Sequence, residues 1–117
     1  MKKVLCAALL SALFCFITTG CAVSVDQAYD SLKDCPYPFD TKIEECVKSN
    51  FPSWSKEEQM QFVIKIFPLT DAGSTYVLME QAEKHGLLLG LAEYAEKNNN
   101  SALKQACQSW IKKANSR

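Results

Sequence analysis

The sequence contains a single histidine, His85, among 117 residues. This count excludes metal sites built from several histidines. A nucleophile made of His85 and a cysteine would need a reactive, exposed thiol in an electropositive setting. His85 lies at a predicted helix C-terminus, where an imidazolium is favourable, and Cys107 lies on an apolar helical stripe. We therefore expect no Cys-His chemistry.

Glycine is also scarce, with four residues, none of which belongs to a phosphate-binding loop. Zinc-ribbon and calcium-loop spacings are missing as well. The adjacent acids Glu44-Glu45 and Glu57-Glu58 stand at predicted helix starts, where carboxylates are favourable, and neighbouring helical residues point about 100° apart. The sequence thus predicts a protein that is not an enzyme and that has no cofactor and no metal.

The sequence has no cluster of basic residues. Lysine and arginine together equal aspartate and glutamate at 13 each, and the two signs are interleaved along the chain. Nucleic-acid binding needs a basic patch or stripe, so we expect no nucleic-acid partner. Period-two alternation and Asn-Gly or Asp-Gly turns are likewise lacking, which argues against a β-sheet.

The N-terminus has the order of a secretory signal peptide. Lys2 and Lys3 precede an uncharged apolar run from position 4 to 17, and small residues follow from Thr18. As a helix, roughly 14 residues extend about 21 Å, which is shorter than a hydrocarbon core of about 30 Å. The run is therefore expected to target the chain for export and not to span a membrane.

The residues Thr18-Thr19-Gly20-Cys21 directly after this run resemble the cleavage box of bacterial lipoprotein precursors. The resemblance covers the signal region only, and Thr18 departs from the usual leucine. It implies that residues 1–20 are removed and that Cys21 is lipidated, which would give a lasting membrane anchor. Because Ala22 follows Cys21 where an aspartate would mark inner-membrane retention, the resemblance implies an outer-membrane lipoprotein facing the periplasm.

Ordinary secretion is the alternative. Gly20 and Ala22 also satisfy the small-residue rule for cleavage after Ala22, which would release a soluble periplasmic or secreted protein beginning at Val23. In both cases the mature chain is one small domain, assigned to residues 21–117. Without Lys2 and Lys3 it retains 11 basic and 13 acidic residues, a net charge of about −2.

Three cysteines follow the signal region and position 21, namely Cys35, Cys46 and Cys107. Disulfides persist in an exported protein, and three thiols allow one intrachain bridge. A Cys35–Cys46 bridge is favoured because prolines fold back the chain between these neighbours. The alternative, Cys46–Cys107, closes a longer loop worth about 4 kcal/mol against about 3 kcal/mol for the short one, a difference too small to decide the pairing.

Helical spacing of apolar residues, together with capping and proline signals, predicts an all-α fold. Thr41 with Glu44 and Ser55 with Glu58 form capping-box patterns, and Gly86 is suited to a helix C-terminus. We expect a small bundle or orthogonal array of five to six short helices, with Leu103 and Trp110 buried in the last one. The expected helices cover residues 25–34, 41–50, 56–67, 71–85, 87–97 and 101–114.

Aromatic residues gather in two proline-containing connections. Tyr37 and Phe39 occupy the first connection, and Phe51 and Trp54 occupy the second. Such residues can fill gaps in the core, or they can be exposed anchors for a partner. We hypothesise a non-enzymatic envelope protein that binds a protein partner through them, such as an immunity protein or inhibitor acting in the periplasm. The alternative hypothesis is a carrier of a hydrophobic ligand, for which residues 87–91 provide an apolar stretch.

Overall fold

The computed structural model describes residues 23–35 and 39–116. Within these ranges the chain forms α-helices and two short 3₁₀ turns, and contains no strand, so the predicted all-α class is confirmed. The elements are α2 (Val25–Lys33), α3 (Phe39–Asn50), η1 (Phe51–Ser53), α4 (Lys56–Ile66), η2 (Phe67–Leu69), α5 (Ala72–Lys84), α6 (Leu88–Lys97) and α7 (Ser101–Asn115).

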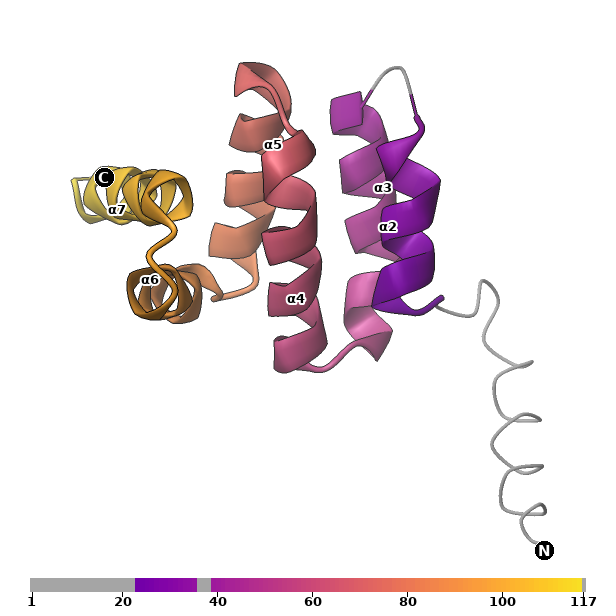
Figure 1. The fold of residues 1–117 in the computed structure, drawn as a ribbon, viewed down its shortest axis with the longest axis horizontal. Helices are drawn as coiled ribbons and strands as arrows, with labels where there is room; N and C mark the ends of the chain where they lie inside the picture. Colours follow the sequence, from indigo (N-terminus) through magenta and orange to yellow (C-terminus); the bar gives the residue numbers. More distant parts are fainter. Residues whose placement is uncertain (1–22, 36–38, 117) are drawn as a thin grey trace, which may run out of the picture.

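The helices form an array and not a parallel bundle. In Figure 1 the four helices α2 to α5 run upright, whereas α6 and α7 are seen nearly end-on at the side away from α2 and α3. Helix α2 packs on α4, α3 packs on α5, and α6 forms a hairpin with α7. The hairpin therefore closes one end of the core at a steep angle to the other helices.

Local signals explain most helix ends. Ser55 and Glu58 form the predicted capping box at the start of α4, and Ser24 with Gln27 forms another at the start of α2. Gly86 follows α5 with φ +70°, as a left-handed residue that ends a helix. The predicted Thr41-Glu44 capping box is wrong, because α3 already begins at Phe39 and so places Thr41 inside the helix.

An aromatic cluster forms the centre of the core. The Phe62 ring makes an edge contact with Phe51 at 5.8 Å between centroids and lies 5.5 Å from Trp54. Edge-to-face and tilted rings at these separations attract one another beyond the effect of apolar burial. Leu103 is fully buried as predicted.

Trp110 packs against the core but is not fully buried, which corrects our expectation for the last helix. It is half-buried and lies near the exposed end of α7, where its ring contacts the Tyr76 ring of α5. The apolar stripe of α7 therefore has a buried first half and a partly exposed second half. Leu103 and Cys107 are buried against the rest of the array, whereas the last turns reach the surface.

Candidate functional site

The aromatic residues predicted to contact a partner are mostly not available for contact. Phe51 is 1% exposed and Trp54 is 7% exposed, so these two residues fill the core, the first of the two roles considered for them, and offer no exposed anchor in this structure. They fill the centre of the array because η1 folds back between α3 and α4. Phe39 is half-buried against the core. Tyr37 lies outside the described residues.

Trp54 instead holds the chain that enters α2. Its Nε1 donates a hydrogen bond of 2.8 Å to the carbonyl oxygen of Val23, and the Val23 N–H donates to Asn50 Oδ1 at 3.0 Å. The Asn50 amide in turn donates to the Cys46 carbonyl oxygen at 2.9 Å and to Cys46 Sγ at 3.3 Å. These bonds fasten the first described residue to the end of α3. We call Val23, Asn50 and Trp54 the entry clamp.

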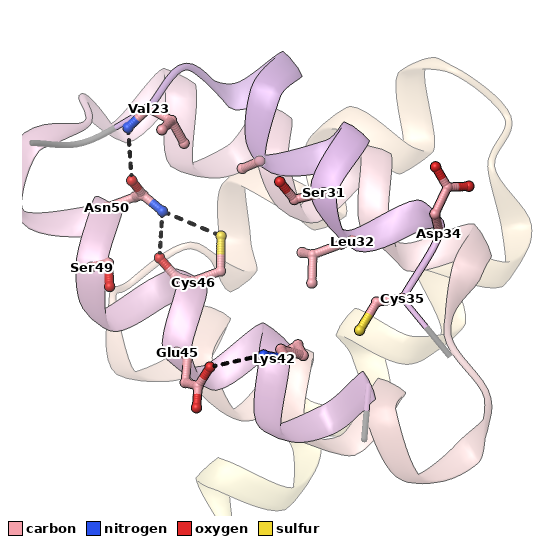
Figure 2. A pocket seen from close by; sticks show the side chains of 11 residues that line it. Val23, Ser31, Leu32, Asp34, Cys35, Lys42, Glu45, Cys46, Ser49 and Asn50 are labelled. Carbon is pink, nitrogen blue, oxygen red and sulfur yellow. Dashed lines mark hydrogen bonds and ion pairs between the residues drawn. The ribbon is translucent and has the colours of Figure 1, made fainter. Parts of the chain in front are cut away.

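A pocket of about 460 Å³ lies between α2 and α3, beside the entry clamp. Figure 2 shows side chains of both helices around it, with Leu32 between the two thiols and the Lys42–Glu45 ion pair at one side. Its lining mixes apolar groups with polar groups at the rim. The lining residues are Val23, Ala28, Ser31, Leu32, Asp34, Cys35, Lys42, Glu45, Cys46, Ser49 and Asn50.

The three cysteines of the described residues are free thiols, so neither predicted bridge is present in the structure. Cys35 and Cys46 nevertheless line the same pocket, one from each side (Figure 2). Cys107 is fully buried in α7 and is not among the pocket residues. Pairing of Cys35 with Cys46 stays a prediction, and it is the pairing that the shared pocket favours.

Burial controls the chemistry of two of these thiols. It raises the pKa of the Cys46 thiol, an effect that the Asn50 hydrogen bond partly opposes. It also raises the pKa of Cys107 to about 11. Because the thiolate is the nucleophile, both groups are protonated and unreactive near neutral pH. The burial of Cys46 and Cys107 therefore gives no support to either of them as a nucleophile.

A second feature, missed by the sequence analysis, lies on the surface between α5 and α7. Tyr76 is 50% exposed, and its ring meets the half-buried Trp110 ring edge-on at 5.1 Å between centroids. Lys113 Nζ lies 5.0 Å from the Tyr76 ring centroid and 4.9 Å from that of Trp110. We call Tyr76, Trp110 and Lys113 the α5–α7 aromatic surface.

The apolar stretch at residues 87–91 forms the start of α6 and does not line the α2–α3 pocket. Leu87, Leu88 and Leu91 are buried in the core, whereas Leu89 is 75% exposed. The stretch therefore packs as a mostly buried helix start. Leu89 provides an exposed apolar side chain that the structure does not place in the α5–α7 aromatic surface.

Within residues 23–35 and 39–116, no three or more His, Cys, Asp or Glu side chains are grouped so that they could hold a metal ion. In the same ranges no helix combines the length and apolar character needed to cross a membrane. Cys21 and the signal region precede the described residues. Comparison with models of protein families, with curated proteins and with solved structures finds no match to this chain.

Proposed function

We propose that the mature chain is a non-enzymatic protein of the cell envelope that binds another protein through the α5–α7 aromatic surface. The observation that carries this proposal is the contact between the exposed Tyr76 and the half-buried Trp110. Tyrosine and tryptophan dominate the binding energy of protein interfaces, because they bury much area at a small cost in side-chain entropy. An immunity protein or inhibitor that meets its target in the periplasm is the concrete form of this proposal.

Replacing Tyr76 and Trp110 together by alanine is expected to abolish recovery of the partner without unfolding the chain. Tyr76 is exposed, whereas Trp110 is half-buried and packs against the core, so circular dichroism of the double variant is used to verify that it folds. The measurement is affinity capture from envelope extracts with tagged mature protein, followed by mass spectrometry.

The matched control is Leu89→Ala, which truncates an exposed apolar side chain outside this surface. The control should recover the same protein as the unsubstituted chain. Equal recovery by the double variant would show that the partner binds elsewhere.

We also propose that the protein is anchored to the outer membrane through acylated Cys21, on the strength of the Gly20-Cys21 box after an apolar run of signal-peptide length. Cys21→Ser is then expected to move the protein from the detergent phase to the soluble fraction. Intact mass spectrometry of the native protein should show a chain that begins at Cys21 and carries acyl groups. A soluble, unmodified chain beginning at Val23 would contradict the anchor and indicate ordinary secretion.

The α2–α3 pocket favours a second candidate, a carrier of a small hydrophobic ligand. A volume of about 460 Å³ falls in the range of small-molecule sites, and Val23, Ala28 and Leu32 give it apolar walls. Organic extraction of natively purified protein, followed by mass spectrometry, separates the two candidates. A stoichiometric lipid would support the carrier, and extraction of none would leave protein binding as the function.

A further inference from the structure

Lys113 places a positive charge in the middle of the α5–α7 aromatic surface. Its ammonium lies within 5.0 Å of the centroids of both rings, close enough for a cation–π attraction to each. A lysine is ordinarily a flexible side chain, but two ring faces restrict this one. The charge therefore lies beside both Tyr76 and Trp110.

A second aromatic residue, Tyr29, also contacts lysines, but the charges of those lysines are paired within the chain. Lys33 and Lys65 both lie over the Tyr29 ring, at 5.8 and 5.1 Å from its centroid. Each also forms an ion pair of 3.3 Å within the chain, Lys33 with Asp30 and Lys65 with Asp26. The cations around Tyr29 are thus balanced by local carboxylates.

Helix α7 provides no such balance of its own. It contains three lysines, Lys104, Lys112 and Lys113, but no aspartate or glutamate. Lys104 pairs with Glu96 of α6, whereas the other two stand in the last turn. The negative end of a helix dipole amounts to about half a charge, which is less than two lysines carry. The end of α7 therefore adds two lysines beside the contact between Tyr76 and Trp110.

We propose, on the basis of the protein-binding function above, that the segment docking on the α5–α7 aromatic surface is acidic. An apolar side chain of the partner packs on Trp110 and Tyr76, and a neighbouring aspartate or glutamate pairs with Lys113. Covering the Lys113 ammonium without a counter-charge would leave a desolvated, unpaired cation, which is strongly unfavourable. A carboxylate offsets that penalty and also accelerates association with the lysine-bearing C-terminus of α7.

The test uses mature protein carrying Cys21→Ser as bait for random peptides displayed on phage. Peptides that also bind the Tyr76→Ala/Trp110→Ala variant are discarded, and a synthetic copy of an enriched peptide is used for affinity measurements. We expect enriched peptides to combine Asp or Glu with an aromatic or aliphatic residue. Lys113→Glu should lower the affinity for the synthetic peptide by about tenfold or more. Replacing the acidic residue of the peptide by lysine should then restore binding to the Lys113→Glu variant.

Lys97→Glu is the matched control, since Lys97 is an exposed lysine in the last turn of another helix, α6. It should change the affinity by no more than about twofold. Enriched peptides without acidic residues, or equal losses of affinity in Lys113→Glu and Lys97→Glu, would contradict the proposal that the partner is acidic. Neither result would contradict protein binding at this surface.

Failure to enrich any peptide that depends on Tyr76 and Trp110 would count against both the acidic partner and the surface itself. In that case the same bait is tested for sedimentation with vesicles of anionic lipid and with vesicles of neutral lipid. Sedimentation with the anionic vesicles alone, lost in Trp110→Ala, would replace the protein partner by a membrane surface.

Discussion

Phe62→Ala is expected to lower the free energy of unfolding by about 3 to 5 kcal/mol, the usual cost of removing a phenyl ring from a core. Phe62 is fully buried, and its ring contacts those of Phe51 and Trp54. These partners come from η1 and the residue after it, so a cavity here would also loosen the connection between α3 and α4. Since small domains are stable by about 5 to 15 kcal/mol, the variant would lose much of its stability.

Urea unfolding followed by circular dichroism measures this loss, and Leu89→Ala is the control. Leu89 is also a large apolar residue, but it is 75% exposed, so its truncation should change stability by no more than about 0.5 kcal/mol. Similar midpoints for Phe62→Ala and Leu89→Ala would show that the aromatic cluster is not the centre of the core.

The second large effect is a loss of unfolding free energy at alkaline pH. Burial raises the pKa of the Cys107 thiol from its ordinary 9.0 to about 11. Between these values the unfolded chain has lost the thiol proton while the folded chain keeps it, so the folded state binds more protons. Stability contributed by the neutral thiol is therefore complete below pH 9 and is lost as the pH rises toward 11. Two pH units correspond to a loss of about 2 to 3 kcal/mol.

This loss is measured as the difference in unfolding free energy across the alkaline range, with Cys107→Ala as the reference. All other ionisable groups are common to both proteins, so their effects cancel in the comparison. The reference protein is expected to be less stable near neutral pH, because it lacks a buried side chain, but to lose less stability as the pH rises. Parallel curves would show that the Cys107 thiol ionises as easily in the folded protein as in the unfolded chain.

The helices could be predicted because their signals are local. Apolar spacing, the Ser55-Glu58 capping box and Gly86 all act within a turn or two of the chain, and the structure confirms each of them. The start of α3 was misplaced for the same reason. Thr41 and Glu44 have the spacing of a capping box, but the helix already begins at Phe39, which packs against the core. The packing of Phe39 against the core thus lies within the first turn of α3, before the start that the local pattern predicted at Thr41.

The candidate surface could not be predicted, because it depends on how distant segments meet. Trp54 and Trp110 both lie close to helix ends. We considered Trp54 as an exposed anchor and expected Trp110 in the core, but Trp54 is buried and Trp110 is only half-buried. Trp54 becomes buried because η1 turns back onto α4, and Trp110 is half-buried because its contacts include both the core and the exposed Tyr76. The meeting of Tyr76 with Trp110 requires the packing of α5 against α7, which no spacing within either helix reveals.

The entry clamp would also determine how an anchored molecule stands on its membrane. If Cys21 carries the lipid, only Ala22 separates it from Val23, whose N–H and carbonyl groups are both bound by the clamp. Two residues span at most about 7 Å, so the domain could not swing freely as it would on a long linker. The α2–α3 end would rest close to the lipid, and the α6–α7 hairpin lies at the other end of the array (Figure 1). So short a tether would leave the α6–α7 hairpin, which carries Trp110 and Lys113, on the side of the domain away from the lipid (Figure 1).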